Sequence, residues 1–307
     1  GVHTGLVVTG DLGSQPDVRN VVGQVPQIAS QLKRSAPANA VAISAATHRL
    51  VKAQFVCQPL STAVEGTASE SFQVTGEASL ELIDSVDGRS APLVGREIES
   101  ALLVEKFRDL ANGQGHVVLL TGEAGIGKSS VIRGFRKAIA GEPVTWLECR
   151  CSPYFDSTAL HPVIEMLKRS MGIGAADSAR DQANKLRAFA KQEGADADAP
   201  LLGWLLGVPI DDGALAGQSP QLLKQRTRDA VCSLLLRMTA KRPVVLVVDD
   251  LHWVDPSTLE LLGALVDEGP SAGILLVLTA RNEFSSPWGS RGHIAQLALS
   301  RLTRPRM

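Results

Sequence analysis

The sequence has few cysteines, almost no net charge and no long apolar run. Four cysteines in 307 residues do not resemble the disulfide framework of a small secreted domain. Cys149 and Cys151 lie two residues apart, but with only His161 nearby they fall short of the four ligands of a structural zinc site. No segment approaches the ~18–20 apolar residues of a membrane-spanning helix. A net charge of −1 gives no support for a nucleic-acid-binding surface or a polybasic membrane patch.

The sequence also lacks an initiator methionine and a recognisable secretory signal. It starts with glycine inside "GVHTGLVVTGD", which favours a strand, and it stops at "LSRLTRPRM", just after a pattern of strands and helices. We therefore expect a fragment of a longer polypeptide. The cysteine usage and the missing signal favour a reduced, cytoplasmic protein.

Short apolar and amphipathic stretches indicate a small domain at residues 1–75. "GLVVTGD", "AVAIS" and "AQFVC" predict strands, and "AATHRLV" predicts a short helix. "PQIASQLKRSA" predicts a longer helix, in which Ile28 and Leu32 share one face. The alternating stretch at residues 71–83, "SFQVTGEASLELI", indicates a hairpin or an edge strand. The small polar residues at 76–90 predict a linker.

From residue 91 on, apolar runs alternate with helical patterns. "HVVLL", "VTWLECR", "RPVVLVVDD" and "AGILLVLTAR" predict strands, whose continuous Val, Ile and Leu runs favour a parallel sheet covered on both faces. The helix "EIESALLVEKFRDLANG" is predicted to stop at Gly113. The segment near residues 199–220 is punctuated by proline and glycine and is interpreted as a connection. We therefore expect an α/β fold over residues 91–307, with a parallel sheet between two layers of helices.

The turn after "HVVLL" fits the pattern G-x-x-x-x-G-K-S/T, and a helix follows it. Glycines let the backbone turn so that N–H groups point at phosphate oxygens, and the helix N-terminus attracts the same anion. Lys128, in a solvent-facing pocket, is expected to reach the β- and γ-phosphates of a nucleotide, and the Ser129 hydroxyl to bind Mg²⁺. The predicted nucleotide-binding residues of this turn are Gly122, Glu123, Ala124, Gly125, Ile126, Gly127, Lys128, Ser129 and Ser130.

Polar residues end two of the other predicted strands. Asp249 and Asp250 follow "PVVLVV", where Mg²⁺ beside a phosphate turn needs a carboxylate. Asp249 is expected to bind Mg²⁺ through water, and Asp250 to polarise the attacking water. Arg281 ends "ILLVLTAR" and is expected to sense the γ-phosphate, with a surface arginine in a loop as the alternative. Asp250, Lys128 and Arg281 are the predicted catalytic residues.

Three residues just after this aspartate pair are interpreted structurally. Asp255 is predicted to cap the next helix, because Pro256 suits the first helical position. His252 and Trp253 are more readily interpreted as packing residues than as catalysts.

The stretches "PLVGRE", "GEAGIGKS", "DDLHWVDPSTLELL" and "LLVLTARNEF", in this order and spacing, resemble the signal-transduction ATPases with numerous domains (STAND), a branch of the AAA-like P-loop NTPases. "CSPYFDSTALHPVIEML" also resembles a helical segment of the cyclase-fused members. The resemblance covers about residues 91–307 and implies adenine contacts at Val94, Gly95 and Arg96. It also implies a switch between a closed ADP-bound state and an open or assembled ATP-bound state. The family's helical lid, winged helix and repeats are expected beyond residue 307, so a lid-borne sensor arginine is not expected in this chain.

"GVHTGLVVTGDLG" and "NVVGQVPQIASQL" are similar to the second half of class III adenylate/guanylate cyclase domains. This resemblance covers about residues 1–75 and implies a partial α+β, ferredoxin-like half-domain. It places the family's metal-binding aspartates before residue 1 and its base-selecting position at Asn20. Its transition-state asparagine and arginine fall on Gln27 and Gln31. Because glutamine is neutral and cannot stabilise a developing phosphoryl charge, the resemblance implies an inactive cyclase domain.

Together these observations predict an ATP-binding and ATP-hydrolysing signal-transduction module that acts as a nucleotide-dependent switch. The expected cofactors are ATP or ADP and Mg²⁺. A protein partner or a second copy is expected through flanking domains, without nucleic-acid or membrane contacts in this chain. Three alternatives stay open: a cyclase-related signalling protein, a structural nucleotide-binding scaffold, and the ATP-binding part of a transcriptional regulator.

Overall fold

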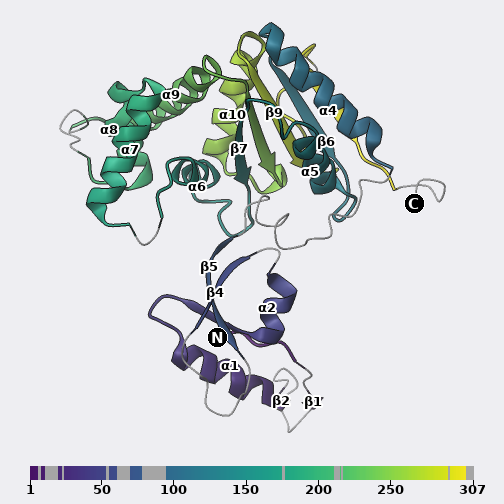
Figure 1. The fold of residues 1–307 in the computed structure, drawn as a ribbon, viewed down its shortest axis with the longest axis vertical. Helices are drawn as coiled ribbons and strands as arrows, with labels where there is room; N and C mark the ends of the chain where they lie inside the picture. The colour runs from purple at the N-terminus through teal and green to yellow at the C-terminus, as the bar shows by residue number, and fades with distance from the viewer. Residues whose placement is uncertain are drawn as a thin grey trace. The chain divides into compact units, whose positions relative to one another are not determined.

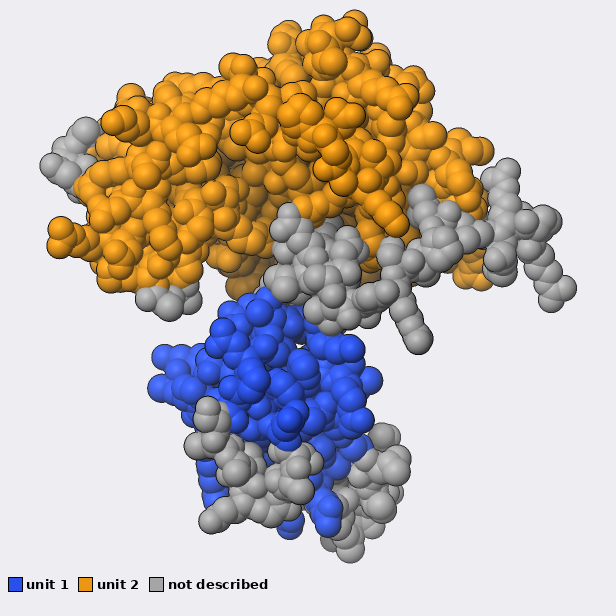
Figure 2. Space-filling model, viewed as in Figure 1, with its two compact units in different colours: residues 1–92 blue, residues 93–307 orange. Residues whose placement is uncertain are grey.

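The computed structural model describes residues 1–5, 8–10, 20–22, 24–52, 55–60, 70–77, 95–174, 177–210, 215, 217–289 and 291–301. The chain divides into two compact units, residues 1–92 (unit 1) and residues 93–307 (unit 2), which Figure 2 colours separately. None of the described helices has the length and apolar character needed to cross a membrane.

Unit 1 contains a three-stranded antiparallel sheet in the order β3–β5–β4. Its strands are β3 (Val41–Ser44), β4 (Phe55–Pro59) and β5 (Ser71–Glu77). The interpretation of residues 71–83 as a hairpin or an edge strand is wrong where the structure describes them, because β5 is a single strand paired on both sides. Residues 78–83 lie outside the described residues. A separate antiparallel pair joins β1 (Val8–Gly10) to β2 (Asn20–Val22), which contains Asn20.

Two helices belong to unit 1, α1 (Gln24–Ser35) and α2 (Ala45–Val51). Leu32 of α1 is buried against Ala42 of β3, and Ile28 packs beside them, so the predicted face of this helix contacts the sheet. Ser44 caps α2 by accepting a hydrogen bond from the Thr47 backbone N–H. Unit 1 thus combines helices with antiparallel strands, while its cyclase-like identity stays a prediction.

Unit 2 is built on five parallel strands in the order β10–β6–β9–β8–β7. These are β6 (His116–Thr121), β7 (Thr145–Arg150), β8 (Val244–Asp249), β9 (Ile274–Ala280) and β10 (Ile294–Ala298). All seven residues of β9 are buried, as are the first five of β8. Strands buried on both faces are typical of a parallel sheet covered by helices, and the predicted α/β fold class is confirmed.

Helices cover both faces of this sheet (Figure 1). They are α4 (Glu97–Asp109), α5 (Lys128–Ala138), α6 (His161–Ser170), α7 (Ala179–Glu193), α8 (Ala199–Leu206), α9 (Pro220–Thr239) and α10 (Pro256–Glu268). On one face Phe135 of α5 contacts Phe107 of α4 and Trp146 of β7, with ring centroids 6.2 and 5.7 Å apart. The short 3-10 turn after α4 ends at Gly113, whose φ of +74° is the left-handed value that favours glycine.

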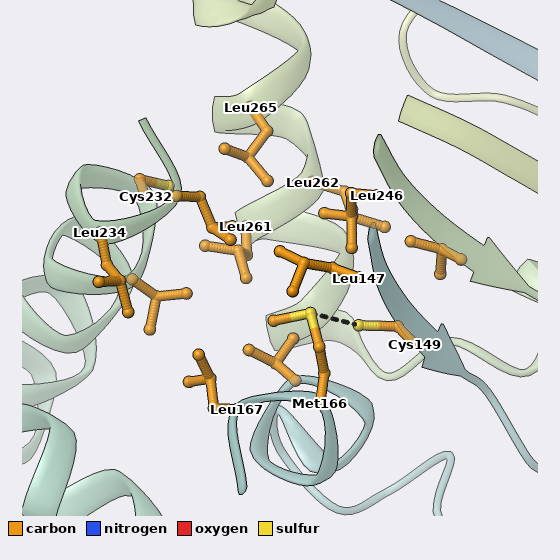
Figure 3. Close-up of a cluster of buried hydrophobic side chains, with 14 of the residues drawn as sticks. Leu147, Cys149, Met166, Leu167, Cys232, Leu234, Leu246, Leu261, Leu262 and Leu265 are labelled. Carbon is orange, nitrogen blue, oxygen red and sulfur yellow. Dashed lines mark hydrogen bonds between the residues drawn. The ribbon is translucent and has the colours of Figure 1, made fainter. Parts of the chain in front are cut away.

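The opposite face packs against α6, α9 and α10 in one large apolar cluster (Figure 3), which α7 and α8 extend by packing against α6 and α9. Leu147 and Cys149 of β7 lie in this cluster, and the Cys149 Sγ donates to Met166 Sδ at 3.5 Å. Burial raises the pKa of the Cys149 thiol to about 12, and it raises the pKa of Cys151 as well. Both cysteines are therefore protonated at neutral pH and act as small apolar core residues.

The sequence did not predict two elements of unit 2. The interpretation of residues 199–220 as a connection is wrong at its start, because α8 buries Leu201 and Leu202 and ends at Gly207 with a φ of +66°. The strand β10 pairs with β6 at the edge of the sheet and is only partly buried. The helix α8 adds to the apolar cluster of unit 2. The strand β10 adds an edge strand to the sheet, and the residues that follow it lie at the end of β6.

Candidate functional site

The glycine-rich turn joins the end of β6 at Thr121 to the start of α5 at Lys128. Within it, Gly125 and Gly127 have φ values of +74° and +108°, which L side chains rarely adopt. Residues 123–125 are exposed. The turn therefore needs glycine at two positions for its backbone conformation and presents its tip to solvent. We call residues 122–127 the phosphate loop, after their predicted ligand.

Lys128 holds this loop through its ammonium group. Its Nζ donates hydrogen bonds to the carbonyl oxygens of Gly122 at 2.8 Å and Glu123 at 3.0 Å, and only 8% of the residue is exposed. The expectation of a solvent-facing lysine is therefore wrong, because the loop carbonyls cover it. An ammonium has three donors, so one remains for a further acceptor.

Ser129 and Ser130 follow Lys128 in the first turn of α5, and both are half-buried. No side chain in the described part of the chain caps this helix N-terminus. The first backbone N–H groups of a helix lack intrahelical partners, and the helix dipole favours an anion there. The loop and the start of α5 thus combine backbone donors, one ammonium and two hydroxyls.

Asp249 ends β8 and is held by the neighbouring strand. The buried Thr279 of β9 donates a hydrogen bond from its Oγ1 to Asp249 Oδ1. The Thr279 Oγ1 also accepts a hydrogen bond from the Asp250 backbone N–H at 3.0 Å. Thr279 therefore fixes both aspartates at the carboxyl end of the sheet. Sequence reasoning missed this threonine, although a polar residue near the end of the apolar strand "ILLVLTA" was a usable indication.

Burial raises the pKa of Asp249 above its usual value. The hydrogen bond from Thr279 and the charge of Arg150 lower this pKa, while the charge of Asp250 raises it. A half-buried carboxylate beside a second acid is a place where a bound cation offsets charge.

Asp250 has a left-handed backbone, with a φ of +58°, and its side chain is about one-third exposed. The His252 Nδ1 lies 4.0 Å from Asp250 Oδ1. Burial lowers the pKa of His252; the charge of Asp250 opposes this shift, and the charges of Arg281 and Lys128 add to it. Asp250 and Arg281 directly follow β8 and β9, and Lys128 follows β6 through the phosphate loop, so the three predicted catalytic residues come from the ends of neighbouring strands.

His252 and Trp253 contact each other with ring centroids 5.2 Å apart. Neither ring nitrogen of His252 has a hydrogen-bond partner among the described residues. The exposed Arg281 places its guanidinium carbon 6.0 Å from the Trp253 ring. The contacts of Trp253 fit the interpretation as a packing residue. His252 also packs against Trp253, but among the described residues its two ring nitrogens make no hydrogen bond.

Of the three residues that the STAND resemblance places against adenine, two are described. Gly95 has a φ of +76° and donates from its N–H to Glu97 Oε1 at 2.8 Å. Arg96 is 5% exposed and donates to the Ile126 carbonyl at 3.1 Å, so it is buried in contact with the phosphate loop. Val94 lies outside the described residues.

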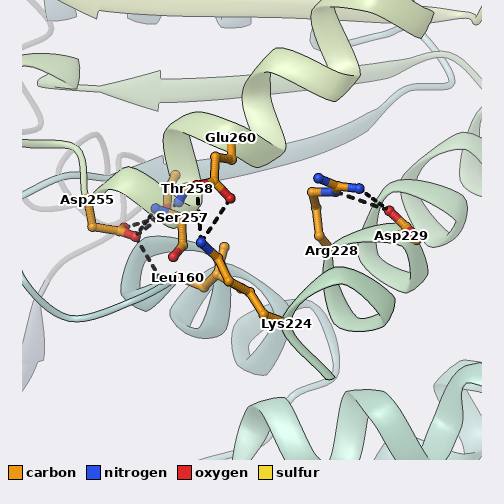
Figure 4. Close-up of polar contacts among 8 residues, drawn as sticks. All are labelled: Leu160, Lys224, Arg228, Asp229, Asp255, Ser257, Thr258 and Glu260. Atoms are coloured by element: carbon orange, nitrogen blue, oxygen red, sulfur yellow. Dashed lines mark hydrogen bonds and ion pairs between the residues drawn. The ribbon is translucent and has the colours of Figure 1, made fainter. Parts of the chain in front are cut away.

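Asp255 caps α10, as predicted (Figure 4). Its Oδ1 accepts hydrogen bonds from the backbone N–H groups of Leu160, Ser257 and Thr258, each at 3.0 Å, and its Oδ2 accepts from the Thr258 hydroxyl at 2.5 Å. Asp255 is 1% exposed. This carboxylate therefore ties the start of α6 to the start of α10, just after the aspartate pair.

The sheet order explains how distant motifs meet. The strand β9 lies between β6 and β8, so one strand separates the phosphate loop from the aspartate pair. Thr279 and Arg281 come from the end of that strand. The residues predicted from three separate motifs thus share the carboxyl edge of one parallel sheet, where open α/β sheets bind ligands.

A protein-family model described as "AAA ATPase domain" matches residues 92–278. An uncharacterized protein of Rhizobium meliloti (strain 1021) is 29% identical over 210 residues, which cover 68% of this chain and 20% of that protein. The chain thus spans about a fifth of the length of this curated relative.

Solved structures of low sequence identity also match. Cdc6p from Pyrobaculum aerophilum has a TM-score of 0.39 at 18% identity, covering 70% of this chain and 48% of that chain. Drosophila ORC bound to DNA has a TM-score of 0.40 at 16% identity, covering 74% and 47%. A STAND protein with a tetratricopeptide repeat sensor from Pyrococcus horikoshii has a TM-score of 0.32 at 17% identity, covering 70% and 24%.

Proposed function

This chain belongs to the family of AAA ATPase domains, and from that membership we propose that residues 91–307 bind ATP or ADP with Mg²⁺ and hydrolyse ATP. The observation that carries the proposal is the phosphate loop between β6 and α5, with two left-handed glycines and the buried Lys128 at its base. This combination offers backbone N–H groups, a helix N-terminus and one cation to the same anion.

Nucleotide phosphates suit the donors of this loop. Phosphate oxygens accept stronger hydrogen bonds from an ammonium than neutral carbonyls do. Lys128 can therefore exchange one or both of its carbonyl acceptors, Gly122 and Glu123, for oxygens of the β- and γ-phosphates. The remaining nucleotide contacts would come from the loop backbone and the first turn of α5.

Mg²⁺ fits the oxygen donors of this edge. Ser129 supplies a hydroxyl and Asp249 a carboxylate, held by Thr279. Mg²⁺ takes one or two carboxylates and completes its shell with water and phosphate oxygens. Bound there, the ion would neutralise phosphate charge. Among the described residues, no three His, Cys, Asp or Glu side chains form a metal-binding group, which distinguishes this site from an all-protein cage.

For hydrolysis, Asp250 is the residue we propose to polarise the attacking water. Its side chain is partly exposed, and its backbone N–H donates to the same threonine hydroxyl that holds Asp249. Lys128 and Arg281 would supply positive charge from the ends of the neighbouring strands β6 and β9. Their role would be to stabilise charge that develops on the transferred phosphate.

We further propose that the nucleotide state acts as a regulatory switch. The STAND resemblance supports this role, and that resemblance also implies the adenine contacts expected at Val94, Gly95 and Arg96. A protein partner or a second copy of the chain would read the state.

The hydrolysis proposal is tested by replacing Asp250. Asp250→Asn should keep ATP affinity and reduce turnover by about 10²–10⁴-fold, because an amide cannot act as a general base. Phosphate release and ATP binding are measured on the same preparations. The matched control is Asp267→Asn, whose side chain is 62% exposed, and it should hydrolyse ATP like the parent. Parent-like turnover by Asp250→Asn would remove this aspartate from the mechanism.

A further inference from the structure

The segment that follows β10, residues 299–301, lies along the phosphate loop. The Leu299 N–H donates to the Thr121 carbonyl at 2.8 Å, and Leu299 is only 6% exposed. Arg301 adds an ion pair to Glu123 at 3.1 Å. Residues almost 180 positions apart in the sequence thus contact each other at the start of the loop.

Gly122 allows this approach. A Cβ placed on Gly122 would lie 3.1 Å from the Leu299 carbonyl oxygen, 3.3 Å from Leu299 Cβ and 2.8 Å from Ile126 Cγ2. These distances are shorter than ordinary van der Waals contacts, so a larger residue would push the segment or the loop away. The first glycine of the phosphate loop therefore also provides space for residues 299–301.

Arg96 contacts both the phosphate loop and the segment 299–301. Its Nη2 donates to the Ile126 carbonyl in the loop at 3.1 Å and to the Ser300 carbonyl at 2.5 Å. Its Nη1 donates to Glu99 Oε1 at 2.9 Å, which orients the guanidinium from α4. The residue is 5% exposed, so these bonds are shielded from water. The planar fork of arginine suits this arrangement, in which one group holds several acceptors.

We propose that Arg96 is a positioning residue that couples the phosphate loop to the segment after β10. By holding the Ile126 carbonyl, Arg96 orients the peptide that leads into Gly127 and Lys128. By holding the Ser300 carbonyl, it makes that orientation depend on residues 299–301. A nucleotide that orders the phosphate loop therefore also orders residues 299–301. Because such coupling is reciprocal, the order of residues 299–301 in turn affects nucleotide affinity. The inference rests on the proposed nucleotide site.

This positioning role differs from a direct contact with adenine. A ligand that has phosphates but no base distinguishes the two roles. Tripolyphosphate contains the phosphate chain and no purine. If Arg96 acts through the loop, its loss weakens Mg-ATP and Mg-tripolyphosphate by the same factor. If Arg96 instead contacts the base, only ATP is affected.

The test measures both affinities for the full chain, Arg96→Met and Arg96→Lys. Arg96→Met should weaken both ligands by roughly ten- to a hundredfold, the usual worth of a buried charged hydrogen bond. Arg96→Lys should fall between this variant and the parent, since an ammonium can reach some of these carbonyls but lacks the fork. Arg108→Met is the control: this arginine lies in α4, is exposed and is not part of the loop or of the segment 299–301, so both affinities should stay within about twofold of the parent.

Amide hydrogen exchange gives a readout that a merely structural role would not change. In the parent, Mg-ATP should slow exchange in the peptide containing Leu299, and in the Arg96 variants this ligand-dependent protection should be reduced or lost. Should Arg96→Met not fold, Arg96→Lys alone decides the question through the same exchange measurement.

The outcomes are distinct. Parent-like protection in Arg96→Lys, or a loss of affinity confined to ATP, overturns the inference. Failure of the parent to bind either ligand overturns the proposed function instead.

Discussion

Asp249 is subject to opposite demands from stability and from metal binding. Burial favours its neutral form and raises its pKa, whereas a ligand for Mg²⁺ must be charged. Thr279 favours the charged form by donating to it, and the nearby charge of Asp250 opposes it. Without a cation, ionising Asp249 therefore lowers the stability of the folded state.

The first prediction follows from the sign of this shift. The folded-state pKa of Asp249 is above its unfolded value near 4, so stability falls as pH rises through the raised pKa. Asp249→Asn should therefore have the higher melting temperature in EDTA at pH 7, and this advantage should shrink towards about pH 4. The same variant should bind ATP with reduced dependence on Mg²⁺.

Thermal melts across this pH range, together with ATP titrations with and without Mg²⁺, measure both effects. Asp267→Asn, at an exposed position, should show neither. An Asp249→Asn variant that melts like the parent at every pH and keeps its full Mg²⁺ dependence would contradict the assignment.

Single residues also show what the sequence could reveal. The loop glycines, Lys128 and the aspartate pair follow from local motifs, because the nearby chain defines their surroundings. Thr279 and the carbonyl contacts of Arg96 depend on strands that are distant in the sequence. Their roles became visible only once β9 was placed between β6 and β8, and β10 beside β6.

At the level of elements, buried and locally capped segments were the predictable ones. The apolar runs of β6, β8 and β9 and the proline start of α10 each contain their own pattern. The strand β10 is short and only partly buried, and among the described strands it pairs with β6 at the edge of the sheet, so its sequence, IAQLA, gives neither a long apolar run nor a clear alternation. The helix α8 was not predicted because Pro200 and Gly203 made its sequence resemble a loop. Pro200 lies in the first turn of α8, where helices tolerate proline.

The second prediction concerns the junction of α6 and α10. Asp255→Ala removes the acceptor of three backbone N–H groups and one hydroxyl in a buried setting. The variant should lower the free energy of unfolding of unit 2 by about 3 kcal/mol, from the lost cap and the buried donors left unpaired. All four tryptophans lie in residues 93–307, so urea denaturation followed by tryptophan fluorescence reports on this unit.

A second cap is the matched control. Ser178 accepts one hydrogen bond, from the Asp181 N–H at the exposed start of α7. Ser178→Ala should cost about 1 kcal/mol. Equal losses for the two variants would show that Asp255 does no more than cap a helix.

On the scale of the whole molecule, we predict that this chain makes no cyclic nucleotide. The helix α1 places Gln27 and Gln31 four residues apart on one face, along a hollow of about 360 Å³. These neutral amides occupy the positions at which the cyclase resemblance expects an asparagine and an arginine. Losing one preorganised donor typically costs about 10²–10³ in rate.

The assay incubates the full chain with Mn²⁺ and ATP or GTP and measures cyclic AMP and cyclic GMP. A Lys128→Ala, Asp249→Asn double variant identifies product that depends on unit 2. Cyclic nucleotide made by the full chain would contradict the prediction, and product that persists in the double variant would assign the activity to unit 1.

The central claim, that the phosphate loop binds nucleotide, is tested most directly by calorimetric titration of the full chain with Mg-ATP. The parent should bind, and Lys128→Ala should bind about ten- to a hundredfold more weakly, since a charged hydrogen bond contributes roughly 1.5–3 kcal/mol. Lys137→Ala, an exposed lysine in the last turn of the same helix, should bind like the parent. A Lys128→Ala variant with a native circular dichroism spectrum and parent-like ATP affinity would contradict the account.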